Sequence, residues 1–355
     1  MPRWAWIVPV AAAGLLAAAV LFPPGSAVLW ACAPALIAAV IASVHHAEVV
    51  AHRVGEPFGT LVLAVSITVI EVALIVSVML AGGPDKATLP RDTVFSAVMI
   101  IVNGVVGLCL LVGGLHHHEQ SFHLDGAKSA LAALIALATL SLVLPSFTTS
   151  SGGSTYTPPQ LAFAAVASLV LWSVFVFVQT VRHRDYFLPP ANPADEEAHA
   201  PPPPLAQAWA SFGLLIVSLV AVVGLAKLLS PGIERGVAEA GLPKAVIGIA
   251  IALLVLLPET WAAVRAARAD RLQTSLNLAL GSALASIGLT IPVVAIASLW
   301  LNLPLVLGIE PKELVLLALS FVVGALTLGT GRTGVMQGAV HLVIFAAYLF
   351  LALVP

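Results

Sequence analysis

The chain has 355 residues, of which 60% are hydrophobic and only 9% charged, with a formal net charge of −2. A soluble domain averages about 25% charged residues because its surface faces water, so this composition excludes an ordinary soluble protein. The small negative charge argues against nucleic acid as a partner. Two cysteines, both in apolar runs, exclude a disulfide framework and a cysteine metal site. With a mean hydropathy of +1.06, we expect an all-α integral membrane protein in a lipid bilayer.

Apolar runs long enough to cross the roughly 30 Å hydrocarbon layer recur along the chain, separated by proline, glycine and charged residues. They predict about eleven transmembrane helices, near residues 4–22, 27–50, 57–81, 92–115, 127–145, 159–181, 206–230, 243–268, 273–300, 312–330 and 333–354. The first run has no convincing cleavage site after it and is interpreted as a membrane helix, with a cleaved signal peptide as the alternative.

The strongest polar interruption covers residues 182–204 and ends in four consecutive prolines, which favour an extended spacer. It divides the chain into an N-terminal transmembrane helix (1–24), a first transmembrane repeat (25–181), a polar Pro-rich cytoplasmic linker (182–205) and a second transmembrane repeat (206–355). More of the 15 Lys and Arg residues fall on the side of the N-terminus, including three in a short loop at 265–271. The positive-inside rule therefore predicts a cytoplasmic N-terminus and an external C-terminus.

Two acidic residues, Glu71 and Glu259, lie in the middle of predicted spans, whereas nearly all the others fall in loops or at span ends. A charge at mid-bilayer costs at least ~2.5–3.5 kcal/mol, so both are candidates for function. The span after each one carries a helix-weakening pair, Asn103-Gly104 in the first half and Gly281-Ser282 in the second. We therefore predict a binding site for a cation and for protons that includes these residues.

Leaving the first span aside, the others form two sets of five. An odd number of helices forces the second set into the opposite orientation, which predicts two inverted five-helix repeats with a midplane site at their interface. Thr68 lies on the same helical face as Glu71, and Ser282, Ser286 and Thr290 recur every four residues on another span. Carboxylates, hydroxyls and amides are the oxygen ligands that Ca²⁺ prefers, although a hydroxyl on a membrane helix often only bonds the preceding turn.

Two carboxyl groups in an apolar cavity favour their neutral forms unless a cation is bound. Protons and Ca²⁺ then compete for the same oxygens, and the pair titrates together. If the empty, doubly charged site is too costly to reorient, the protein changes orientation only with cation or protons bound. This restriction predicts an antiporter that needs no cofactor, with Ca²⁺ and H⁺ as transported substrates.

The segments GEPFGT (55–60), IEVALI (70–75) and LPE (257–259), with the stretch from Leu272 to Pro292, resemble the bacterial calcium/proton antiporters of the CAX branch of the cation/calcium exchanger superfamily. The resemblance implies an eleven-helix fold in a bacterial inner membrane and Ca²⁺/H⁺ exchange, with Na⁺ or K⁺ as further substrates in this subgroup. It also implies that Glu71 and Glu259 are the repeat glutamates, with metal-binding roles.

The chain departs from the commoner family repeats at three positions. Thr68 and Leu256 stand where those repeats have asparagine, and Thr260 replaces a histidine that often follows the second glutamate. A site that is less selective for calcium is therefore an alternative.

His45 and His46 near the end of span 27–50, and Glu56 before span 57–81, are candidates for a cation gate or a pH sensor, because histidine titrates near neutrality. Interfacial polar residues are the simpler interpretation. His341, in the last span, is interpreted as a packed, hydrogen-bonded residue rather than a proton carrier.

Three other functions compete. A Na⁺(K⁺)/H⁺ antiporter would use the same oxygen ligands. A membrane-embedded protease would need His-Glu-x-x-His, which is not in the sequence, or a serine–histidine pair in the membrane, for which only His341, away from the end of its span, is available. A channel fits one glutamate per repeat less well than a carrier does. The sequence does not indicate the oligomeric state.

Overall fold

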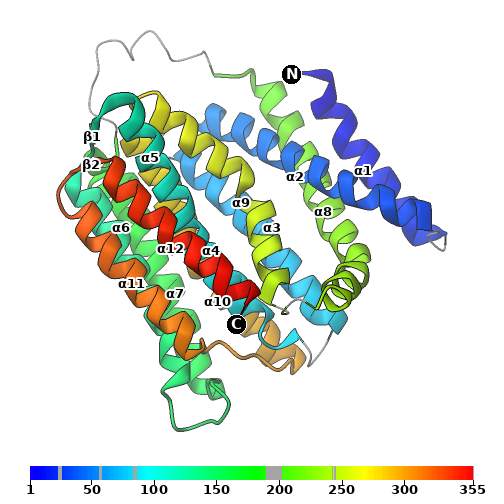
Figure 1. Ribbon diagram of the computed structural model, residues 1–355. Helices are drawn as coiled ribbons and strands as arrows, with labels where there is room; N and C mark the ends of the chain where they lie inside the picture. Colours follow the sequence, from blue (N-terminus) through cyan, green and yellow to red (C-terminus); the bar gives the residue numbers. More distant parts are fainter. Residues whose placement is uncertain are drawn as a thin grey trace.

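The computed structural model describes residues 1–22, 26–55, 58–82, 86–188, 202–241, 243 and 245–354, and these are almost entirely helical (Figure 1). The first half contains α1 (Arg3–Leu21), α2 (Ser26–Val54), α3 (Phe58–Gly82), α4 (Leu89–Met99), the π-helical turn η2 (Ile100–Val105), α5 (Val106–His117), β1 (Glu119–Ser121), α6 (Leu124–Ala138), η3 (Thr139–Val143), η4 (Leu144–Ser146), α7 (Pro158–Phe177), η5 (Val178–Arg182) and η6 (Arg184–Tyr186). The second half contains α8 (Leu205–Glu239), α9 (Ala245–Arg268), α10 (Leu272–Leu301), α11 (Pro311–Leu328), β2 (Arg332–Gly334) and α12 (Val335–Leu353).

Each of the eleven predicted spans is helical over most of its described residues, with the exceptions at span ends, and α4, η2 and α5 together form one span. Among the described residues, nine helices are long and apolar enough to cross a membrane. α9, which is bent by 52° between Leu257 and Glu259, makes a tenth, and the apolar part of α3 identified within the described residues, Ala64–Leu80, is shorter. The all-α membrane fold is therefore confirmed.

One boundary differs clearly from the prediction. α8 does not end before Pro231 but continues through it to Glu239. A proline removes one backbone donor, but within a bundle the adjacent turns and neighbouring helices can satisfy the freed carbonyl.

The helix contacts repeat with two-fold pseudosymmetry. α3 packs on α10 in the way that α9 packs on α4 and α5, and α7 packs on α10 in the way that α12 packs on α5. α2 and α8 pack on each other across the middle. In these contacts each of the five spans after α1 has a counterpart among the last five spans, as expected for inverted repeats. α1 lies outside this arrangement, at the edge of the bundle beside α2 and α8 (Figure 1).

Burial separates the centre of the bundle from its surface. The rod formed by α4, η2 and α5 and the long helix α10 are the most enclosed spans, whereas α7 and α12 expose large apolar side chains such as Phe163, Val174 and Phe350. An apolar outer surface is stable against lipid tails. The enclosed helices α4–η2–α5 and α10 therefore form the middle of the protein, where the functional site is expected.

Candidate functional site

The two predicted glutamates are buried in the middle of the bundle. Glu71 on α3 is 4% exposed and Glu259 on α9 is 7% exposed. Ser286 donates a hydrogen bond of 2.7 Å to Glu71 Oε1, and Ser282 donates one of 2.5 Å to Glu259 Oε2. Both serines lie on α10, one turn apart, so a single helix holds both carboxyl groups. The two carboxyl groups also interact electrostatically with each other.

Neither glutamate forms an ion pair within the described part of the chain, which sets them apart from Asp92 at the start of α4. The Asp92 carboxylate pairs with Arg91 at 2.7 Å and accepts a hydrogen bond of 3.1 Å from Thr88. A buried carboxylate without a cationic partner is costly unless it is protonated or binds a cation. Glu71 and Glu259 are therefore suited to bind protons or a metal cation, whereas the charge of Asp92 is already compensated.

The local backbone explains the position of Glu259. α9 bends by 52° between Leu257 and Glu259, and the sequence has Pro258 at this point. A proline inside a helix lacks the donor for the carbonyl four residues earlier and kinks the chain. The next residue, Thr260, donates its hydroxyl to the Leu256 carbonyl at 2.7 Å, so this hydroxyl bonds the preceding turn.

A pocket reaches Glu259 from one side of the membrane. Besides Glu259 it is lined by Gly281 and Ser282 of α10, by residues of α3 and α7, and by Gln179 of η5. Gly281 borders open space, since no atom lies within 4 Å of the position that a Cβ would occupy. Asn277 of α10, which also lines this pocket, donates a hydrogen bond to the carbonyl of Phe187, within the polar linker 182–205. This pocket therefore opens on the linker side.

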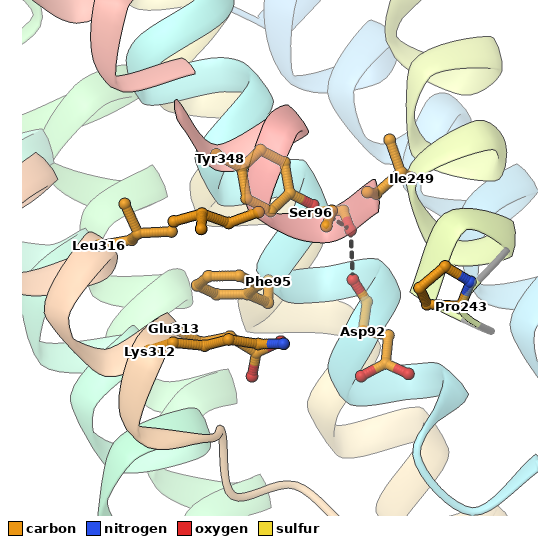
Figure 2. A pocket seen from close by; sticks show the side chains of 11 residues that line it. Asp92, Phe95, Ser96, Pro243, Ile249, Lys312, Glu313, Leu316 and Tyr348 are labelled. Carbon is orange, nitrogen blue, oxygen red and sulfur yellow. Dashed lines mark hydrogen bonds between the residues drawn. The ribbon is translucent and has the colours of Figure 1, made fainter. Parts of the chain in front are cut away.

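A second pocket lies toward the opposite ends of the helices (Figure 2). It is formed by α4, α9, α11 and α12. Three of these helices correspond by pseudosymmetry to the helices that line the first pocket: α4 corresponds to α10, α9 to α3, and α12 to α7. On its inner side the Tyr348 hydroxyl donates to Ser96 Oγ at 2.8 Å, and the Tyr348 ring meets Phe95 edge-on with centroids 5.6 Å apart.

This second pocket stops short of the glutamates. Ile249, which lines it, and Glu259 are ten positions apart on α9, which corresponds to about 15 Å along a helix. Glu259 therefore adjoins the pocket on the linker side and lies about 15 Å along α9 from the opposite pocket.

Three of the predicted site residues make contacts with groups other than the two glutamates. Thr68 donates to the Ala64 carbonyl of its own helix at 2.9 Å. Asn103 donates to Ser320 Oγ at 2.8 Å, and its Oδ1 lies 3.3 Å from Nδ1 of His341. Gly104 faces the ring of Phe345. The π-helical turn η2 contains both Asn103 and Gly104, and it adds a residue to the turn, so side chains after it point elsewhere than α-helical spacing predicts.

The structure thus brings together Glu71, Glu259, Gly281 and Ser282 from the predicted set, and it adds Ser286. The four-residue spacing from Ser282 to Ser286 was the signal for this residue, because it places both hydroxyls on one face of α10.

The gate and pH-sensor candidates lie elsewhere. His46 donates from Nε2 to the Ala5 carbonyl at 2.8 Å, and the His45 ring lies 4.9 Å from that of Trp4. These contacts join α2 to α1, at the edge of the bundle. Glu56 lies outside the described residues.

Comparisons with known proteins show the family to which this chain belongs. The family described as "Sodium/calcium exchanger protein" matches residues 25–181 and 210–354. A "Putative ionic transporter y4hA" of Sinorhizobium fredii is 50% identical over 100% of this chain and 97% of its own length. A "Sodium-potassium/proton antiporter ChaA" of Escherichia coli K12 is 36% identical over 88% of this chain and 85% of its own. A "Ca(2+)/H(+) antiporter" of Aphanothece halophytica is 26% identical over 76% and 75%.

Two solved structures share the fold over nearly the whole chain. The H⁺/Ca²⁺ exchanger CAX superposes with a TM-score of 0.73 at 13% identity, covering 98% of this chain and 89% of that one. Native YfkE superposes with a TM-score of 0.71 at 17% identity, covering 99% and 100%. The predicted resemblance and membrane fold are confirmed.

Proposed function

Because this chain belongs to the sodium/calcium exchanger protein family, whose members are ion antiporters, we propose that it exchanges Ca²⁺ for protons by alternating access. The observation that carries the proposal is that one helix, α10, holds the carboxyl groups of Glu71 and Glu259 through Ser286 and Ser282. Neither carboxyl group has a cationic partner among the described residues.

The oxygen atoms of this site support calcium as the cation. Four carboxylate oxygens and two serine hydroxyls make six, and Ca²⁺ takes six to eight oxygen ligands. Two carboxylates also balance the charge of one divalent ion. When the cation leaves, the two buried negative charges repel each other and are poorly solvated, so proton binding replaces it.

Two pockets on opposite sides supply the routes for alternating access. The linker-side pocket is lined by Glu259, whereas neither glutamate is among the residues that line the second pocket. Because the pockets are formed largely by corresponding helices of the two repeats, opening one while closing the other requires only that the repeats exchange conformations. The site reorients when it is neutral, with either Ca²⁺ or protons bound.

The predicted topology completes this proposal. The N-terminus lies in the cytoplasm of a bacterium and the C-terminus outside the inner membrane, with helix 1–24, repeats 25–181 and 206–355, and a cytoplasmic linker at 182–205. Arg265 and Arg268, at the end of α9, then lie on the cytoplasmic side, in agreement with the positive-inside rule. In this orientation the conformation described here is open to the cytoplasm.

Exchange of Na⁺ or K⁺ for protons is the second candidate. The 36% identity to a sodium-potassium/proton antiporter favours it. So do the hydrogen bonds of Thr68 and Asn103, which occupy these side chains away from the glutamates and leave fewer oxygens for a divalent ion.

The deciding experiment is cation-driven proton movement in inverted membrane vesicles, followed with a pH-sensitive dye. Addition of Ca²⁺ is expected to dissipate an acid interior in the wild type, and Glu71→Gln or Glu259→Gln to abolish the response. Glu119→Gln, at an exposed carboxylate in β1, is the matched control and should respond normally. A response to Na⁺ or K⁺ but not to Ca²⁺ would establish the second candidate, and normal exchange by both glutamate variants would reject the site.

A further inference from the structure

A buried polar network joins the middle of the rod formed by α4, η2 and α5 to α11 and α12. Asn103 in η2 donates to Ser320 of α11 at 2.8 Å. His341 of α12 contacts Asn103 Oδ1 through Nδ1 at 3.3 Å, and Thr327 of α11 through Nε2 at 3.1 Å. All four side chains are at most 5% exposed. Such a network is stable only if its members satisfy one another.

The partners determine the form of the imidazole. Because the Asn103 amide nitrogen donates to Ser320, its Oδ1 can only accept, so Nδ1 of His341 carries the proton. Nε2 then accepts from the Thr327 hydroxyl. The Val102 carbonyl also faces the ring. The groups that face His341 from η2 and α11 in the described structure are therefore all neutral, and a neutral histidine completes the network.

The network lies beside the glutamate site without being part of it. η2 contacts both α10, which carries Ser282 and Ser286, and α9, which carries Glu259. The pseudosymmetric counterpart of the rod is α10, which is α-helical throughout and directs its hydroxyls at the glutamates. The rod instead contains the π-helical turn and directs Asn103 toward α11 and α12. The amide oxygen of Asn103, a suitable ligand for a hard cation, is thus held away from the site next to it.

We propose that His341 is a positioning residue of the exchange cycle: its hydrogen bond retains Asn103 in the network, and breaking it lets the amide turn toward the glutamates and bind the cation. This inference rests on the proposed function at Glu71 and Glu259. It gives the two conformations different ligand sets, with the amide withheld when the site is open to the linker side. A cation that is bound less tightly in one conformation is released there more readily.

His341→Leu tests this role, since it removes both hydrogen bonds of the ring. With the retaining bond lost, the half-saturating cation concentration for exchange is expected to fall about fivefold, the effect of one hydrogen bond of ~1 kcal/mol, and the maximal rate to fall with it. The same substitution in an Asn103→Ala background should produce no such shift. His341→Gln, which keeps a donor and an acceptor, should restore values close to those of the wild type.

Ser168→Ala is the matched control, because it breaks another buried polar contact between spans, the 3.3 Å bond from Ser168 to Ser141. It should leave the half-saturating concentration unchanged. If His341→Leu does not fold as a monodisperse protein in detergent, Thr327→Val, which removes the hydroxyl that orients the ring, should give a smaller shift in the same direction.

An unchanged or higher half-saturating concentration in whichever of these two variants folds would overturn the inference, as would an equal shift in the Asn103→Ala background. These outcomes are distinct from failure of the proposed function, in which Glu71→Gln and Glu259→Gln would both exchange normally.

Discussion

The Ser286 hydroxyl of α10 donates a 2.7 Å hydrogen bond to the Glu71 carboxyl group of α3, so a side chain of the second repeat orients the central acid of the first. Ser282 orients Glu259 from the same face of α10. The geometry of the site therefore depends on the position of α10 relative to two other helices, and a movement of α10 changes both carboxyl groups together.

The serine contacts lead to a first prediction. Ser286→Ala should raise the half-saturating cation concentration by roughly 10- to 100-fold, because a hydrogen bond to a charged group contributes about 1.5–3 kcal/mol. Ser282→Ala should act in the same direction. The measurement is cation titration of proton movement in vesicles. Ser298→Ala, on the same helix but bonded to the Leu303 carbonyl, is the control; an equal effect in this variant would show that α10 was merely destabilised.

A second prediction concerns pH. Protons and the cation compete for the same carboxylates, so cation binding should weaken as pH falls. If two protons leave when one cation binds, each unit of pH increase should lower the half-saturating concentration by up to about 100-fold until both carboxyl groups are ionised. Binding of ⁴⁵Ca²⁺ or ²²Na⁺ to purified protein over a pH series gives this slope. A slope no steeper than tenfold per unit would mean that a single proton competes.

The third prediction concerns access from the two sides. In a background without Cys32 and Cys109, Gly281→Cys should react with a membrane-impermeant thiol reagent from the linker side, because Gly281 borders open space. Ser96→Cys, at the position that is hydrogen-bonded to Tyr348, should react slowly from both sides in the conformation described here. Labelling of inverted and right-side-out vesicles measures both rates. Fast labelling at position 96 alone would mean that the protein rests in the opposite conformation.

Tyr348→Phe provides a fourth prediction. It removes the hydrogen bond to Ser96 but keeps the ring contact with Phe95. The closed arrangement on that side should lose about 1 kcal/mol, the net contribution of one hydrogen bond. The accessible fraction there should therefore rise severalfold. To measure this fraction, Ala97→Cys is added at the buried position next to Ser96 on α4, and its rate of thiol labelling is compared with and without Tyr348→Phe. An unchanged labelling rate would show that the hydrogen bond does not control closure.

Packing between α5 and α12 leads to a fifth prediction. A Cβ on Gly338 would meet the Leu111 amide nitrogen and the Gly107 carbonyl, which are backbone atoms and cannot move aside cheaply. Gly338→Ala should destabilise the protein by about 1–3 kcal/mol, as overpacked core substitutions do, and lower the midpoint of thermal unfolding in detergent. Gly14→Ala, in α1 with open space around it, should leave the midpoint unchanged.

The sequence was sufficient to predict the helices and the two acids, for physical reasons that do not depend on tertiary contacts. Apolar length determines which segments can cross a bilayer, and a glutamate in the middle of such a segment is costly enough to be informative by itself. Glu71 and Glu259 were found in this way. The inverted arrangement followed from the odd number of spans, five, in each repeat once the first span is set aside.

The orientation of the polar neighbours could not be predicted in the same way. Whether Thr68 faces an ion or bonds Ala64 in its own helix depends on a rotamer that the spacing does not determine. Asn103 lies within a π-helical turn, and helical spacing assumes that no such turn occurs. The contact of His341 with Asn103 joins residues 238 positions apart, so it depends on how the two repeats pack.

The polar face of α10 continues one turn beyond the two contacts that it makes. Thr290 follows Ser286 by four residues, and its buried hydroxyl has no hydrogen-bond partner among the described residues. Of the three hydroxyls on this face, two therefore bond the glutamates and the third is available. If α10 slid by one turn, about 5.4 Å, Thr290 would face Glu71 and Ser286 would face Glu259. Both acids would keep a hydroxyl donor, so the spacing of these three side chains would give the shifted helix the same number of hydrogen bonds.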